Sequence, residues 1–270
     1  MTLHFIHIGQ TGGTSIKRAL RGAKLAYWHE ENAHKVPETP YGRIQLHPHR
    51  FRMRHVPPED HVFFCLRDPI ERFLSAFYSR MNKGQPRYYV EWSDVERRAF
   101  EAFPTPQRLA GALASADVGE RSLAKLALRN IRHMGLMLGV VTPTQLYSRP
   151  GQVVYIGRQE TLATDWEQLK LLLRLPPDLK LPTAQVEAHR REASLDTTLD
   201  PAAVAALRKW YRDDYLLLKY CDALRAWNHW GAGPPPAGAL RLRYELVRIR
   251  GLPAVLPPFP PWIQRRLIGG

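Results

Sequence analysis

The fold is decided by the stretch His7-Ile8-Gly9-Gln10-Thr11-Gly12-Gly13-Thr14-Ser15-Ile16. Residues 3–8 read as a short buried strand that carries two histidines, His4 and His7, and residues 14–21 have the pattern of a helix. A strand, a glycine-bearing turn and a helix in this order bring backbone amides to one point, where they bind an anion. The stretch therefore predicts an anion-binding loop at the end of a strand.

The residue types of this loop suit a phosphate-like group. Gly12 and Gly13 permit backbone angles that turn successive amides inward, and Thr11, Thr14 and Ser15 add hydroxyl donors. A nucleoside triphosphatase loop would read G-x-x-x-x-G-K-[ST]. No lysine precedes Thr14 or Ser15, which argues against ATP or GTP hydrolysis.

A second anion site is predicted in the stretch Phe63-Phe64-Cys65-Leu66-Arg67-Asp68-Pro69-Ile70-Glu71-Arg72-Phe73-Leu74-Ser75-Ala76-Phe77. Residues 62–66 read as a buried parallel strand, and a helix begins at Pro69 and continues over residues 71–83. Arg67 follows the strand, at the edge where open α/β sheets bind ligands, and its planar fork can take two phosphate oxygens. Ser75 lies in the helix, where its hydroxyl can face the same anion.

Strands and helices alternate along the rest of the chain. Further strands are predicted at 41–47 and 153–156, and helices at 162–173 and, as one long amphipathic element, 201–230. Residues 90–140 have an irregular helical pattern. This order predicts the α/β class: a P-loop-like central parallel sheet flanked by helices, with a helical insertion.

The C-terminal part has a different composition. We assign residues 1–230 to one α/β domain and residues 231–270 to a Pro/Arg-rich extension. The extension could pack back on the domain, reach a partner or touch a membrane surface through Trp262, Ile263, Leu267 and the Arg265-Arg266 pair.

The charge balance favours anionic partners. Lys+Arg number 39 against 25 Asp+Glu, a net charge of +14, but charge alone specifies no partner. We find no helix-turn-helix signature and no aromatic RNA-binding strand, and expect no nucleic-acid partner. Cys65 and Cys221 make no disulfide framework, and no run approaches the roughly 18 apolar residues of a membrane span. A cytoplasmic location is predicted, with peripheral membrane contact of the extension left open.

Three motifs in order resemble a known family, the third being Tyr155-Ile156-Gly157-Arg158-Gln159-Glu160 followed by Asp165-Trp166. The first resembles H-I-P-K-T-G-G-T-S and the second R-D-P-x-x-R-x-x-S of the carbohydrate-type sulfotransferases, which include heparan sulfate and chondroitin O-sulfotransferases and bacterial relatives. These enzymes use 3′-phosphoadenosine 5′-phosphosulfate (PAPS) and release the 3′,5′-bisphosphate PAP. The resemblance implies sulfuryl transfer to a hydroxyl of a glycan, a glycolipid or a small metabolite, without a metal.

The resemblance also implies roles for individual residues. Arg67 and Ser75 would bind the 3′-phosphate, and Arg158 would contact the nucleotide or substrate, with a helix-capping role equally open. The 5′-phosphosulfate would be held by Gly9, Gln10, Thr11, Gly12, Gly13, Thr14 and Ser15.

Gln10 stands where the family has a lysine that neutralises charge on the leaving oxygen. Lys17 or Arg18 could supply the missing charge in a working enzyme. Alternatively, the chain binds PAPS or PAP and transfers slowly or not at all.

A base near the acceptor hydroxyl is also required. The resemblance implies His47, in Gln45-Leu46-His47-Pro48-His49, with His49 as the rival. His29, His55 and His61 are weaker candidates, and the histidines lack a consistent metal-ligand spacing. The acceptor is predicted to lie under residues 85–140, where Arg87, Tyr88, Tyr89 and Trp92 suit a sugar.

Overall fold

The computed structural model describes residues 1–86, 88–141, 143–182 and 195–228. Its centre is a five-stranded sheet with the order β2-β3-β1-β4-β5, in which every pairing is parallel. The strands are β1 (Thr2–Ile6), β2 (Ala26–Tyr27), β3 (Arg43–Leu46), β4 (His61–Leu66) and β5 (Val153–Arg158). The predicted α/β class with a central parallel sheet is confirmed.

The register places the ends of three strands side by side. Phe5 of β1 pairs with Leu46 of β3 on one side and with Phe63 of β4 on the other. The chain therefore leaves β1, β3 and β4 at one edge of the sheet. The crevice outside the carboxyl ends of such strands is where open α/β sheets bind ligands.

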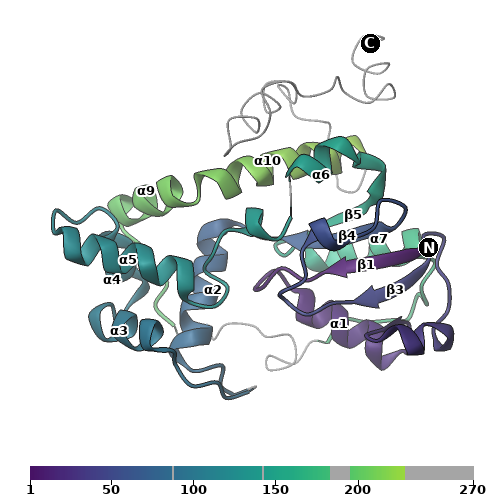
Figure 1. Cartoon of the computed structure of the whole chain (residues 1–270), viewed down its shortest axis with the longest axis horizontal. Helices are drawn as coiled ribbons and strands as arrows, with labels where there is room; N and C mark the ends of the chain where they lie inside the picture. Colours follow the sequence, from purple (N-terminus) through teal and green to yellow (C-terminus); the bar gives the residue numbers. More distant parts are fainter. Residues whose placement is uncertain (87, 142, 183–194, 229–270) are drawn as a thin grey trace, which may run out of the picture.

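Helices cover both faces of the sheet because strand side chains alternate between the faces. Figure 1 shows α10 (Arg212–Trp227) above the sheet and α1 (Gly13–Gly22) below it. On the α1 face, side chains of β1 and β4 pack with α1 and α7 (Leu162–Leu173), and this cluster includes Leu3, Phe5, Ile16, Leu20, Phe63, Trp166 and Leu169. On the α10 face a second cluster includes Ile6, Val62, Phe64, Ile156, Leu217 and Cys221.

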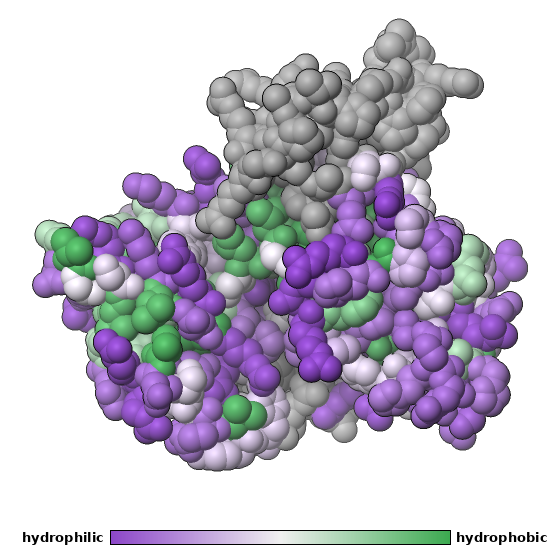
Figure 2. Space-filling model, in the orientation of Figure 1, coloured by the Kyte–Doolittle hydropathy of each residue, from purple (hydrophilic) through white to green (hydrophobic). Residues whose placement is uncertain are grey.

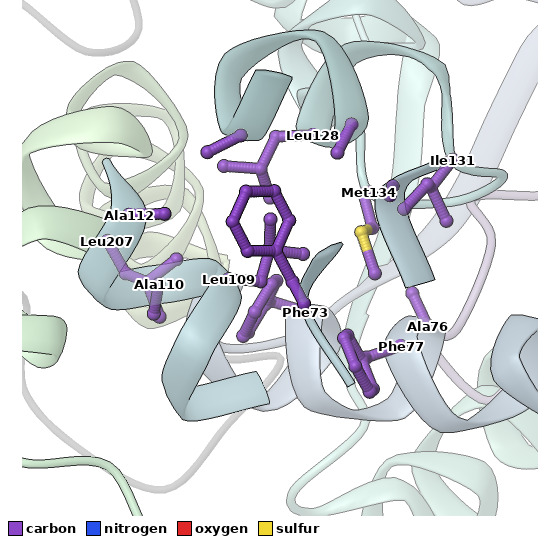
Figure 3. Packing of buried hydrophobic residues seen from close by; sticks show 14 of the residues in the cluster. Phe73, Ala76, Phe77, Leu109, Ala110, Ala112, Leu128, Ile131, Met134 and Leu207 are labelled. Atoms are coloured by element: carbon purple, nitrogen blue, oxygen red, sulfur yellow. The ribbon is translucent and has the colours of Figure 1, made fainter. Parts of the chain in front are cut away.

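A helical lobe lies beside the sheet and holds a third core cluster. The lobe consists of α3 (Asp94–Ala102), α4 (Pro106–Ala112), α5 (Val118–Asn130), α9 (Pro201–Trp210) and part of α2 (Pro69–Met81). Phe73 and Phe77 of α2 point into this cluster, where Leu109, Leu128 and Met134 surround them (Figure 3). The predicted helical insertion is thus one packed unit attached to the sheet by α2.

Short elements complete the described chain. They are α6 (Pro143–Ser148) and four 3₁₀ helices: Glu30–Lys35, Met53–His55, Met137–Gly139 and Pro150–Gln152.

The predicted long helix over 201–230 is wrong, because α9 ends at Trp210 and α10 begins at Arg212. Tyr211 lies between them with φ −91° and ψ 18°. Its side chain is fully buried, and its hydroxyl donates to the Met134 carbonyl at 2.8 Å, a partner that a buried tyrosine needs. The first predicted strand also ends two residues earlier, at Ile6, and the helix from Pro69 ends at Met81. The predicted extension, residues 231–270, lies outside the described residues.

The face drawn in Figure 2 is largely hydrophilic, with hydrophobic side chains gathered on the helical lobe. Val118 and Leu126 of α5 are among the exposed hydrophobic residues. None of the helices in the described ranges has the length and apolar character needed to cross a membrane.

The helical lobe should depend on Phe73. Phe73→Ala removes a fully buried ring and leaves a cavity, so the free energy of unfolding should fall by about 3–5 kcal/mol. Urea unfolding followed by circular dichroism measures the change. Leu171→Ala, at a position that is 81% exposed, is the control and should change the value by less than about 0.5 kcal/mol. Equal losses in both variants would contradict the assigned core.

Candidate active site

The glycine loop joins β1 to α1 and requires glycine at two positions. Gly12 occupies the N-cap of α1 with φ +83°, a conformation that favours glycine, and an added Cβ would lie 2.7 Å from Leu162 Cδ2. An added Cβ at Gly13 would collide with the His7 ring. Thr11 Oγ1 donates to the Ile8 carbonyl at 2.9 Å and closes the loop on itself. The loop therefore presents the N-terminus of α1 without side chains at the two glycines, as an anion-binding loop must.

The two predicted anion motifs meet at Gln10. Ser75 Oγ donates to Gln10 Oε1 at 2.9 Å, and Arg67 Nη1 lies 3.4 Å from the Gln10 carbonyl oxygen. Arg67 Nη2 also lies 3.4 Å from Glu71 Oε2. The structure thus brings Arg67, which follows β4, and Ser75 of α2 against the loop that follows β1.

Arg72 also holds the loop, a role that was not predicted from the sequence. Its side chain is buried in α2, where Nε donates to the Gly9 carbonyl at 3.0 Å and Nη1 to the Gly135 carbonyl at 2.8 Å. Burial lowers the pKa of Arg72, and the charge of Asp214 opposes this. The second arginine of R-D-P-x-x-R-x-x-S was the available signal, because a charged residue on the buried face of a helix needs partners.

Asp214 anchors the segment that Arg72 reaches. This carboxylate of α10 is fully buried and accepts from the amides of Met137 at 2.9 Å and Leu138 at 3.0 Å. Burial raises the pKa of Asp214, with the charge of Arg72 and the two amides opposing.

The third motif forms a network next to the second. Arg158 at the end of β5 contacts Glu160 at 3.1 Å and Asp222 at 3.3 Å. Glu160 Oε1 in turn accepts from the Asp68 amide at 2.6 Å. The predicted nucleotide contact of Arg158 stays a prediction, and the structure shows its guanidinium bound to these two carboxylates.

His47, predicted as the base, lies directly after β3, and its side chain is buried. Its ring stacks on Phe51 with centroids 3.6 Å apart, and its Nε2 lies 2.8 Å from His4 Nδ1. His4 Nε2 lies 3.1 Å from Asp60 Oδ2, so a buried chain runs from a carboxylate through two imidazoles. Burial lowers the pKa of His47 to about 3, and the charges of His4 and Lys17 contribute. Burial likewise lowers the pKa of His4, although Asp60 opposes the shift.

Lys17, predicted as a substitute for the loop lysine, is buried on α1. Its ammonium group donates to the His47 carbonyl and lies 4.4 Å from the centroid of the Trp28 ring. Burial lowers the pKa of Lys17 to about 7, and Arg21 adds to this. The structure therefore places this cation on the chain segment that carries His47.

A second group of histidines gathers at the start of the loop. His49 is exposed, and its ring centroid lies 3.9 Å from that of His7 and 4.6 Å from that of His133. The His133 ring lies against Gly9, where an added Cβ would collide with Nδ1. No sequence signal pointed to His133, because it lies far from Gly9 in the chain and belongs to none of the three motifs.

The weaker histidine candidates lie elsewhere. His55 packs edge-on against Phe51, and His61 begins β4, at the amino end of the sheet. His29 precedes the 3₁₀ helix Glu30–Lys35. Among the described residues, no group of three or more His, Cys, Asp or Glu side chains could hold a metal ion.

The central strand of a parallel sheet runs into a glycine loop, and an arginine after the neighbouring strand and a serine from the following helix meet at that loop. This arrangement defines a P-loop-like α/β protein. The sequence profile of the sulfotransferase family matches residues 2–221, so this chain belongs to that family of PAPS-dependent transferases, which includes carbohydrate sulfotransferases. The family predicted from the three motifs is confirmed. Comparison with curated proteins gives no significant match.

The loop should not tolerate a methyl group at Gly13. Gly13→Ala should weaken PAP binding at least about tenfold, because the added Cβ pushes on His7 or moves the loop. Titration calorimetry with PAP measures the loss. Gly22→Ala, at the other end of the same helix and with nothing within 4 Å of the added Cβ, should bind as the wild type does. Unchanged affinity in Gly13→Ala would show that the loop is not the anion site.

His47 should make stability depend on pH. Below pH 6.5 the unfolded chain protonates this imidazole, whereas the folded protein does not until about pH 3, so stability falls as pH falls. Between pH 7 and pH 5 the loss from His47 should be about 2 kcal/mol.

Urea unfolding at the two pH values, compared with His47→Asn, isolates this contribution. The wild type should lose more stability than His47→Asn over this range, while His34→Asn, at an exposed position, should follow the wild type. Parallel losses in wild type and His47→Asn would overturn the assignment.

Proposed function

We propose that this chain transfers the sulfuryl group of PAPS to a hydroxyl of an acceptor, a carbohydrate or glycolipid, and releases PAP. The observation that carries the proposal is the contact of the two anion motifs at Gln10, through Ser75 at 2.9 Å and Arg67 at 3.4 Å. One donor molecule with a phosphosulfate and a separate phosphate needs two such sites at one edge of the sheet. Membership of the sulfotransferase family supports the same donor.

The proposed roles follow from the chemistry of the donor. The amides and hydroxyls of residues 9–15 hold the phosphosulfate, while Arg67 and Ser75 hold the 3′-phosphate. In the transfer, the acceptor oxygen forms a bond to sulfur and its proton passes to a base. The bond between sulfur and the 5′-phosphate oxygen breaks, and that oxygen keeps the electron pair. Catalysis of this kind rests on positioning and on stabilising the leaving oxygen.

His49 suits the base role better than His47. The His49 ring is exposed and contacts His7, the residue two positions before Gly9. The His47 ring is buried, engages His4 through Nε2 and has a pKa lowered to about 3, which makes it a weak base at neutral pH. We therefore assign the proton transfer to His49, and to His47 the anchoring of the segment that carries it.

An aromatic segment after α2 supports an acceptor with sugar rings. Tyr89 is 58% exposed, and Lys83 lies over its ring and over that of Trp92. Trp92 itself donates to the Arg80 carbonyl at 2.7 Å and packs on the helical lobe, so Tyr89 is the better contact for a sugar. Arg87 lies outside the described residues, as does the extension proposed for peripheral membrane contact.

Gln10 is the specific reason to keep a second candidate, a PAPS- or PAP-binding protein with little or no transfer. A glutamine at this position brings no positive charge to the leaving oxygen, and its Oε1 already accepts from Ser75. Donor binding would be intact in such a protein.

Transfer of radiolabelled sulfate from PAPS to a panel of glycans and glycolipids tests the proposal. We expect transfer by the wild type, and about tenfold or greater loss of PAP affinity in Arg67→Ala, because a charged donor to phosphate is removed. Arg97→Ala, at an exposed position of α3, is the matched control and should bind normally. Unchanged affinity in Arg67→Ala would refute the assigned phosphate site.

Gln10→Lys separates the two candidates. If the wild type binds PAP but labels no acceptor, and Gln10→Lys restores transfer, the chain is a binding protein.

A further inference from the structure

The turn that carries His133 is held against the glycine loop by the side chains of Tyr211 and Arg72. The backbone of His133 has φ 71°, a left-handed conformation that is uncommon outside glycine and persists where the surroundings hold it. The next two carbonyls are both fixed: Met134 accepts from Tyr211, and Gly135 accepts from the same Arg72 guanidinium that binds the Gly9 carbonyl. The turn that carries His133 and the start of the loop are therefore joined by one side chain.

His133 and His49 are neighbours across the start of the loop. Their ring centroids lie 4.6 Å apart, and His7 follows at 3.9 Å from His49. Two imidazolium ions at this separation repel each other, so protons bind such a pair one at a time. Arg72 of α2 adds positive charge near the two histidines. The negative charge of Asp214, on α10, interacts with Arg72 and offsets this positive charge. A bound polyanion would add a strong attraction for a proton.

The proposed transfer requires positive charge at the leaving oxygen, and the guanidinium groups of Arg67 and Arg72 both contact backbone carbonyls of the loop. Gln10 carries no charge, and Lys17 is bound to the His47 carbonyl. The His133 ring packs on Gly9, the residue directly before Gln10.

We propose that His49 and His133 work as a pair that shares one added proton: protonated His133 stabilises the leaving oxygen in place of the loop lysine, while neutral His49 takes the proton of the acceptor hydroxyl. The inference rests on the proposed sulfuryl transfer. As the acceptor oxygen bonds to sulfur, its proton moves to His49. As the sulfur–oxygen bond to the 5′-phosphate breaks, the negative charge on the released oxygen faces the His133 imidazolium. The proton on His49 then passes to solvent, and the pair returns to its starting state.

Proton uptake on nucleotide binding tests the pair without turnover. Calorimetry of PAP binding at pH 7.5 in two buffers of different ionisation enthalpy gives the number of protons taken up. The phosphates of PAP are already ionised at this pH, so uptake reports on the protein. Wild type and the exposed control His34→Gln should take up protons, and His133→Gln should take up clearly fewer.

The rate tests the role of the charge. His133→Gln should lower kcat about 100-fold, as removal of one donor to a developing oxyanion does, while KM for the acceptor changes little. His133→Lys should recover much of the loss, because it restores a cation under the same backbone conformation. Gln10→Lys should also rescue His133→Gln, which makes the two positions non-additive in a double-mutant cycle.

The outcomes separate this inference from the proposed function. Transfer by the wild type together with unchanged proton uptake and unchanged kcat in His133→Gln overturns the pair and leaves sulfuryl transfer standing. If neither His133→Lys nor the addition of Gln10→Lys restores the kcat lost in His133→Gln, His133 has only a structural role. Absence of transfer by the wild type refutes the proposed function, and the calorimetric comparison then still decides whether His133 receives a proton.

Discussion

The buried guanidinium of Arg72 joins the glycine loop to the helical insertion. Arg72 donates to the carbonyls of Gly9 and Gly135, each 63 residues away in the sequence and on opposite sides of it. A buried charge requires such partners, and breaking them leaves an uncompensated ion. Because the loop and the turn of His133 share this one hydrogen-bond donor, their positions relative to each other are fixed. The role proposed for His133 depends on that contact.

The break between α9 and α10 serves the same arrangement. Tyr211, at the break, donates to Met134, and Asp214, one turn later, accepts from Met137 and Leu138. α9 packs in the helical lobe, whereas α10 lies on the sheet (Figure 1). One continuous helix would have to pack on both the lobe and the sheet along a single axis. The break at the buried Tyr211 allows α9 and α10 each to have its own axis.

Local patterns predicted the sheet, the loop and the second motif because those features depend on neighbours in the chain. The continuous apolar strand at 62–66, the paired glycines and the arginine after that strand are all visible within about 15 residues. Roles that depend on burial could not be read in the same way. His47 and His49 differ by two positions, yet one is 7% exposed and stacked on Phe51 whereas the other lies open beside the loop.

The sequence by itself determined the class of this protein: a parallel α/β sheet, two anion motifs at its edge and, through their order, the sulfotransferase family. Only the tertiary structure decided which charges meet. It placed Lys17 on the His47 carbonyl, Arg72 on two distant carbonyls and His133 on Gly9. The reason is physical: motifs are short-range patterns, whereas the charge and proton affinity of a side chain are set by whatever the fold packs around it.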